Sequence, residues 1–147
     1  MAEDNLRRHY GRVHSMHVAA FAAHLVECRK LCDGDLDLFL VLTIVGERTF
    51  AQRNAPDLSF EEWSSASVSM IKPEAINLQS IADYSGIPRE TVRRKLERLI
   101  EKGWVTRDAR NYVTATDAAK QSLGALTESN LRYLETMRKA FGAIDAA

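Results

Sequence analysis

The sequence predicts a mainly α-helical protein with one small β-hairpin, and three features support this fold class. Most of the 147 residues lie in segments whose apolar side chains recur at the three-to-four-residue spacing of a helix. Two short helical segments meet at Gly86, and a segment rich in β-branched and aromatic residues follows Gly103. The two longest helical segments lie at the ends of the chain.

The central feature is a predicted pair of helices at residues 77–103. Leu78–Ser85 reads as a helix, and the side-chain oxygen of Asn77 can accept a hydrogen bond from a free N–H at its start. Gly86 suits the left-handed residue that ends a helix. Pro88 fixes a helical φ and needs no N–H partner, so a second helix is expected from about Arg89 to Lys102.

The second helix is amphipathic, and a hairpin follows it at residues 104–115. One stripe of the helix is apolar and is expected to pack on a core: Val92, Leu96, Leu99 and Ile100. Trp104–Thr106 and Tyr112–Thr114 are the expected strands, with a turn at Asp108–Asn111. Two helices around a tight turn followed by a hairpin constitute a winged helix-turn-helix.

The opposite face of the second helix is rich in charge. It carries Arg89, Glu90, Arg93, Arg94, Glu97 and Arg98, and the hairpin carries Arg107 and Arg110. Residues 78–110 hold eight Lys or Arg against five Asp or Glu, a net of +3 in a chain whose total is zero. Positive charge at this place favours contact with DNA phosphates. The alternative is a solvated helix face held by the Glu90–Arg94 and Arg94–Arg98 neighbours.

The segment SIADYSGIPRETVRRKLERLIEKGWV resembles the winged helix-turn-helix of bacterial transcription regulators of the DeoR, GntR and MarR kind. The matching residues are Ala82, Gly86, Thr91-Val92-Arg93-Arg94, Leu96, Leu99 and Gly103. Many relatives place Ser or Thr where Pro88 stands, so the start of the recognition helix, and its first base-facing position, are expected to shift by a residue. The resemblance implies a DNA-binding transcription regulator.

The remaining core, within residues 36–115, is expected to be helical. Leu36–Val45 is apolar nearly all round and predicts a buried helix that runs to about Arg53, with Asp35 as its N-cap. Leu58–Ser65 contains a capping box in Ser59 and Glu62. Residues 64–73 read as a loop. Trp63 beside this loop either packs on the core or lines a pocket for a small-molecule effector.

Long helices are expected at both ends, within residues 1–32 and 116–147. Asp4–Leu31 and Asp117–Ala143, the latter capped by Thr116, would each be about 40 Å long at 1.5 Å per residue. Their apolar faces are longer than one small domain can cover, which predicts a homodimer. Long terminal helices that flank a winged unit resemble the MarR-type plan, in which these helices of two chains intertwine.

The first of these helices holds all the histidines and both cysteines: His9, His14, His17, His24, Cys28 and Cys32. The spacing of the histidines fits a metal site poorly, and interface histidines packed between apolar neighbours are the preferred interpretation, with a pH-sensitive interface left open. The cysteines are interpreted as buried thiols, and the alternative is a redox switch or an interchain bond.

Composition predicts an ordinary globular chain in a single domain, residues 1–147, with 46% apolar and 27% charged residues. No signal peptide or membrane-length apolar segment is recognised, and we therefore expect a cytoplasmic location. There is no phosphate loop, catalytic triad or clear metal motif, so neither an enzyme nor a cofactor is expected.

We therefore expect a homodimeric, sequence-specific transcription regulator that binds double-stranded DNA and inserts residues 89–98 into the major groove. Arg93 and Arg94 are candidates for guanine and Glu90 for cytosine, while Thr91, Arg107 and Arg110 would meet phosphate or the minor groove. The rival hypothesis is a winged helix that contacts only proteins, which the neutral pI of about 6.9 favours.

Overall fold

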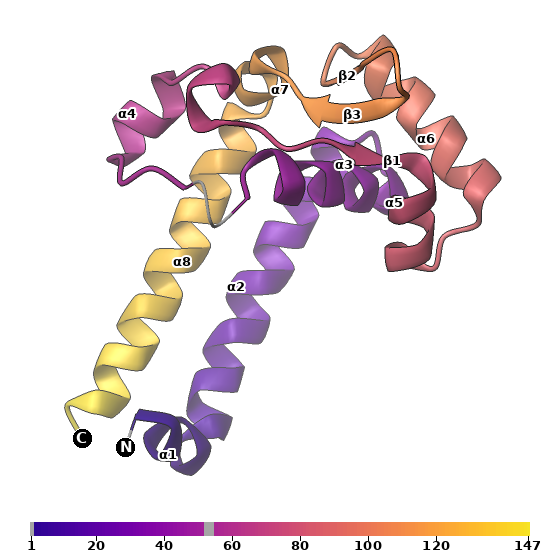
Figure 1. Ribbon diagram of the computed structural model, residues 1–147. Helices are drawn as coiled ribbons and strands as arrows, with labels where there is room; N and C mark the ends of the chain where they lie inside the picture. The colour runs from indigo at the N-terminus through magenta and orange to yellow at the C-terminus, as the bar shows by residue number, and fades with distance from the viewer. Residues whose placement is uncertain (1, 52–54) are drawn as a thin grey trace. The chain divides into compact units, whose positions relative to one another are not determined.

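The computed structural model describes residues 2–51 and 55–147, and it confirms a mainly helical fold with a small antiparallel sheet (Figure 1). The chain divides into two compact units. One comprises Met1–Gly34 and Ala125–Ala147, and the other comprises Asp35–Gly124. The expected winged helix-turn-helix lies in the second unit.

The sheet of the second unit has three strands, one more than the sequence predicted. Strands β2 (Val105–Arg107) and β3 (Tyr112–Ala115) form the expected hairpin. The additional strand, β1 (Ile76–Asn77), pairs antiparallel with β3, so that the order is β1-β3-β2 (Figure 1). Two residues are too few to give a periodic signal, and this strand forms because the chain entering the helix-turn-helix meets a free edge of the hairpin.

Three helices pack with this sheet: α3 (Leu36–Thr49), α5 (Leu78–Ser85) and α6 (Arg89–Glu101). Asp35 caps α3 as expected, by accepting a hydrogen bond from the Leu38 N–H at 2.9 Å. The helix ends at Thr49, before the expected end at Arg53, and Arg53 itself lies outside the described residues. The most deeply buried side chains of this core are Leu38, Val41, Val45, Ile81, Val92, Leu96, Leu99 and Val113.

Two short helices precede the sheet in the sequence, α4 (Phe60–Ser65) and the 3₁₀ helix η2 (Val68–Ile71). The capping box of Ser59 and Glu62 is present. The loop expected at residues 64–73 is therefore partly wrong, because η2 lies within it. Its first N–H, from Val68, bonds to the carboxylate of Asp117, a partner 49 residues away that local sequence does not reveal.

The first unit contains α1 (Ala2–Arg8), α2 (Tyr10–Leu31) and the long helix α8 (Gly124–Asp145). The single helix expected from Asp4 to Leu31 is wrong, because the chain breaks at His9, where φ is −111° and ψ is 19°. This break lets Leu6 pack against a cluster of Val13, Met137 and Ile144. Burial of an apolar side chain thus outweighs continuation of the helix.

The C-terminal helix is also interrupted. The chain expected as one helix from Asp117 to Ala143 forms α7 (Asp117–Ser122) and α8, which are separated at Leu123. Thr116 caps α7 as expected, by accepting from the Ala119 N–H at 3.1 Å. The break has a local cause, because Gly124 is a poor helix former and Leu123 is buried.

The predicted histidines and cysteines form contacts inside the first unit. The Nδ1 atoms of His17 and His24 lie 2.8 Å from the Tyr133 hydroxyl and 2.9 Å from the Ser129 hydroxyl, respectively, and so join α2 to α8. Cys28 and Cys32 are free and buried, as expected. Burial, together with neighbouring Cys32, raises the pKa of Cys28 to about 11, which keeps the thiol protonated and opposes the redox alternative.

A buried hydroxyl connects α3 to the central strand. Thr49 donates to the Val45 carbonyl at 2.9 Å and accepts from the Ala115 N–H on β3, also at 2.9 Å. Because the Thr49 hydroxyl and the Ala115 N–H are both buried, water cannot replace the hydrogen bond between them. Thr49 is therefore the polar contact that holds the sheet against the first helix of the winged unit.

Thr49→Val preserves the shape of the side chain but leaves the Ala115 N–H unsatisfied. We expect the free energy of unfolding to fall by about 1–3 kcal/mol, measured by urea denaturation. Thr43→Val is the matched control, because Thr43 lies on the same helix and also donates to a backbone carbonyl, but is exposed. An equal loss in both variants would show that the Thr49–Ala115 bond contributes nothing.

Candidate nucleic-acid interface

The turn between α5 and α6 is built by residues with distinct roles. Asn77 caps α5 by accepting from the Ser80 N–H at 2.8 Å, and Gly86 ends this helix in the left-handed conformation with φ of 73°. A side chain at Gly86 would strain that backbone conformation. Ser85 then accepts a hydrogen bond from the Ile87 N–H at 3.1 Å. These contacts fix the angle at which the chain enters α6.

Helix α6 begins at Arg89, with Pro88 in the N-cap position and no side-chain cap. As expected from the resemblance, no Ser or Thr hydroxyl caps the start of α6. Pro88 lies just before the helix and is not its first residue. Val92, Leu96 and Leu99 are buried, as predicted, whereas Ile100, the fourth residue of the expected stripe, is only half-buried. Their burial turns the charged face outward, where it can meet a partner.

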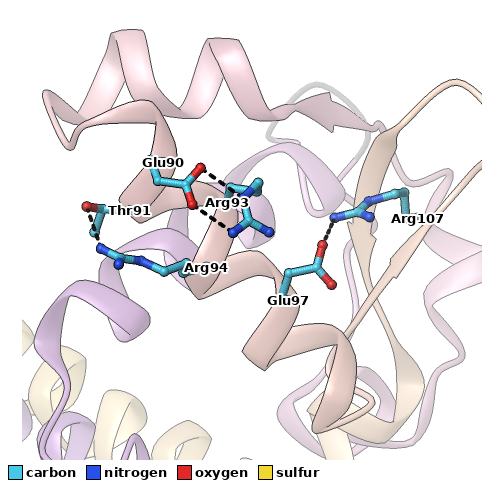
Figure 2. Close-up of polar contacts among 6 residues, drawn as sticks. All are labelled: Glu90, Thr91, Arg93, Arg94, Glu97 and Arg107. Carbon is cyan, nitrogen blue, oxygen red and sulfur yellow. Dashed lines mark hydrogen bonds and ion pairs between the residues drawn. The ribbon is translucent and has the colours of Figure 1, made fainter.

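The outward face contains a two-point ion pair, which Figure 2 shows. The Nε and Nη2 atoms of Arg93 donate to the two carboxylate oxygens of Glu90 at 2.9 and 2.7 Å. This pairing at i, i+3 replaces the Glu90–Arg94 and Arg94–Arg98 neighbours considered from the sequence. The hydrogen bond from Arg93, which outweighs partial desolvation, lowers the pKa of Glu90.

Arg94 and Arg89 have neutral partners. Arg94 lies near the Thr91 hydroxyl at 3.5 Å, which is at the limit of a hydrogen bond (Figure 2). Arg89 donates from Nε to the Gln79 side-chain oxygen at 3.1 Å, and Gln79 in turn donates to Asp83 at 2.8 Å. Gln79 thereby connects α5 to the start of α6, and the hydrogen-bond partners of both guanidinium groups are uncharged.

Two further cations of α6 point to the N-terminus of α3. Lys95 Nζ and Arg98 Nη1 donate to Oδ2 of Asp35 at 2.7 and 2.8 Å. Arg98 was predicted to contact DNA, whereas Lys95 was not singled out. Neither partnership could be found from the sequence, because Asp35 is 60 and 63 residues away from these side chains.

The wing contributes one paired and one unpaired arginine. Arg107 reaches from β2 to Glu97 on α6, with Nη2 3.1 Å from Oε1 (Figure 2). Arg110 lies in the turn, where the Asp108 carboxylate accepts from the backbone N–H groups of Arg110 and Tyr112 at 2.8 and 3.0 Å. These bonds hold the turn and leave the Arg110 guanidinium at an exposed tip.

The predicted DNA-contacting residues therefore lie on one helix and the adjoining wing, but their charges are not equally available. Within residues 2–51 and 55–147, no carboxylate pairs with Arg89, Arg94 or Arg110. Arg93, Arg98 and Arg107 each have an acidic partner. We name the first three the unpaired arginines.

Other kinds of site lack support in the part of the chain that the structure describes. No group of three or more His, Cys, Asp or Glu residues is arranged there to hold a metal ion. Among the same residues, no helix is both long and apolar enough to cross a membrane.

The Glu90–Arg93 pair can be tested without DNA. Arg93→Ala is expected to raise the pKa of Glu90 toward the ordinary value of a glutamate, because the change removes the hydrogen bond that lowers this pKa most. Carboxyl NMR titration measures the shift. Arg94→Ala serves as the control and should have a smaller effect, since Arg94 acts on Glu90 only through its charge. A larger pKa shift in the Arg94 variant would show that Glu90 pairs with Arg94 instead of Arg93.

One known protein family matches this part of the chain. Residues 72–109 match the family described as the IclR helix-turn-helix domain. Searches of curated proteins and of solved structures gave no match. The matched segment runs from β1 through α5 and α6 into the wing, and it leaves the narrower DeoR, GntR and MarR resemblances as predictions. Residues 72–109 thus form a helix-turn-helix domain of the kind that DNA-binding transcription regulators contain.

Proposed function

We propose that the protein is a sequence-specific transcription regulator that binds double-stranded DNA as a homodimer. The observation that carries this proposal is the outward face of α6, which presents Arg89 and Arg94 without acidic partners in a segment that matches a helix-turn-helix family. An α-helix fits the major groove, where arginine can grip guanine with two hydrogen bonds.

Arg94 is the best candidate for base recognition. It is exposed, and on a helix of 100° per residue it lies nearly opposite the buried stripe of Val92, Leu96 and Leu99. Its only hydrogen-bond partner among the described residues is the weakly placed Thr91 hydroxyl. Binding to the edge of a guanine would therefore cost Arg94 only this weak hydrogen bond to Thr91.

The remaining candidate contacts fall into two groups. Arg110 at the wing tip is suited to a backbone phosphate, since it is exposed and unpaired. Arg93 and Glu90 are paired with each other. Either side chain can contact a base only when this ion pair opens or when an N–H group of Arg93 bonds to Glu90 and the base at the same time. Arg107 can meet phosphate on the same condition, through release from Glu97.

A second copy of the chain is the proposed occupant of the exposed apolar surface of the first unit. Residues 16–26 of α2 contain no Asp, Glu, Lys or Arg, yet Val18 and Val26 are 48% and 51% exposed. Ala19, Ala22 and Ala23 are exposed in the same stretch and allow two helices to approach closely. On α8, Leu134 and Phe141 are also exposed.

A homodimer accounts for this surface because apolar helix faces of such length seldom remain in water. A two-fold dimer would also supply two recognition helices, and dimers of this kind read half-sites about 34–36 Å apart. Dimerisation and the symmetry of the DNA site are therefore linked parts of the same proposal.

A protein-contact module remains the rival function. Its support is the neutral overall charge, together with the internal pairing of Arg93, Arg98 and Arg107. The two functions differ in their response to salt, because DNA binding releases counterions and weakens steeply as salt rises.

The test of function is selection of DNA from a random pool by the purified full chain, followed by binding measurements over a range of salt. We expect one near-palindromic sequence to be enriched, with log K falling by about 0.9 per phosphate contact for each unit of log salt. No enrichment and a flat salt response would favour the protein-contact function.

Arg94→Ala is expected to weaken binding to the selected sequence by about 1–3 kcal/mol and to relax preference at one base pair. The physical reason is the loss of a two-point contact to guanine. Titration against the selected site and its single-base variants measures both effects. Arg48→Ala is the matched control, because it removes the same charge from an exposed position on α3. An unchanged base preference in the Arg94 variant contradicts the assignment.

The proposed dimer predicts a mass of twice 16.5 kDa in light scattering. The double change Val18→Glu and Val26→Glu should shift the protein toward monomer, since it would bury two carboxylates in the interface. Met70→Glu is the control, because Met70 is 75% exposed but lies in the other unit. A monomeric wild-type chain, or a double variant that still dimerises, would contradict this interface.

A further inference from the structure

Asp35 makes three contacts with one carboxylate. Oδ1 accepts from the Leu38 N–H at 2.9 Å and caps α3, while Oδ2 accepts from Lys95 and Arg98 of α6 at 2.7 and 2.8 Å. The Asp35 side chain is only 17% exposed. A carboxylate fixed by the helix it caps cannot follow its partners, so Lys95 and Arg98 are held where Asp35 lies.

The Asp35 contacts differ from the other ion pairs of α6. The Glu90–Arg93 pair joins two exposed side chains on the same helix, whereas Lys95 and Asp35 are 21% and 17% exposed and join different helices. Burial alone would raise the pKa of Asp35, but the hydrogen bonds from Lys95 and Leu38 and the charge of Arg98 outweigh it and lower the pKa. The carboxylate therefore stays ionised near neutral pH.

The position of these contacts along α6 divides its cations. Arg89 and Arg94, in the first half of the helix, have no acidic partner, whereas Lys95 and Arg98 share Asp35. A lysine and an arginine one turn apart would otherwise be suited to phosphate contacts that are the same for every DNA sequence. Pairing with Asp35 would make these two cations less available to phosphates and would leave Arg89 and Arg94 as they are.

We propose that Asp35 is a specificity-determining residue, which withholds Lys95 and Arg98 from DNA phosphates and so limits binding to unrelated sequences. This inference rests on the proposed DNA-binding function and deepens it. Asp35 acts through α6 and touches no DNA. Because Asp35 caps α3 and bonds to two cations of α6, it also adds a directional polar contact between these two packed helices.

The cap and the ion pairs can be separated by mutation, because Asn caps a helix about as well as Asp but carries no charge. Asp35→Asn should therefore keep α3 intact and remove the carboxylate charge that Lys95 and Arg98 share. Asp37→Asn is the matched control. It removes the same charge from an exposed residue in the first turn of the same helix.

The measurement is binding of the full-length variants to the DNA selected by the wild type and to an unrelated duplex of equal length, over a range of salt. For Asp35→Asn on the unrelated duplex we expect the salt slope to steepen by about 1–2, which corresponds to one or two added phosphate contacts. The ratio of specific to non-specific affinity should fall by about tenfold, since unrelated sequences gain most. Asp37→Asn should change neither quantity by a comparable amount.

A rescue variant separates release of charge from structural damage. In the Asp35→Asn chain, replacement of both Lys95 and Arg98 by Gln should return the salt slope to the wild-type value, whereas damage to α3 would persist. Equal slopes for the Asp35→Asn and Asp37→Asn variants, or failure of the rescue, would overturn the inference while the wild type still selects its DNA. Absence of selection by the wild type would instead overturn the proposed function itself.

Discussion

Burial of one side of α6 is the constraint on which the rest of the winged unit depends. Val92, Leu96 and Leu99 are almost fully buried, and full burial of such side chains contributes about 1.5–3 kcal/mol each. No rotation of α6 could retain this burial and present a different face. The charged face is therefore turned outward by the apolar stripe, while the turn at Gly86 sets the direction of the helix axis.

Once that face is fixed, competition among ionic contacts decides which cations are available. Exposed ion pairs contribute only about 0.2–1 kcal/mol, so Arg93 and Arg107 can exchange their carboxylates for another anion at little cost. Asp35 is half-buried, takes two cations and caps a helix, and it holds its partners more firmly. The arginines thus form a series, from the unpaired Arg94 through Arg93 to the retained Arg98.

The sequence was sufficient where a structural signal is local. Asn77, Gly86, the capping box at Ser59 and the amphipathic stripe of α6 all depend on neighbours within a few residues, and the structure confirms each. Features that depend on distant partners were missed. Asp35 was recognised as a cap but not as the partner of Lys95 and Arg98, and the break at His9 accompanies packing of Leu6 against residues of α8 that are far away in the sequence. The break at Leu123 does have a local signal, Gly124, but the apolar periodicity that continues through it concealed that signal.

The net charge of the whole chain bears on how strongly the protein would be attracted to DNA in general. The chain is neutral overall, so the net charge of +3 over residues 78–110 is offset by −3 elsewhere. Such a molecule has little long-range attraction to DNA, and its proposed binding must come from short-range contacts. On α6 itself, Lys95 and Arg98 are paired with Asp35, so the proposed short-range contacts with DNA phosphates are also reduced. The proposed affinity for DNA then depends mainly on the unpaired arginines, which can distinguish one sequence from another.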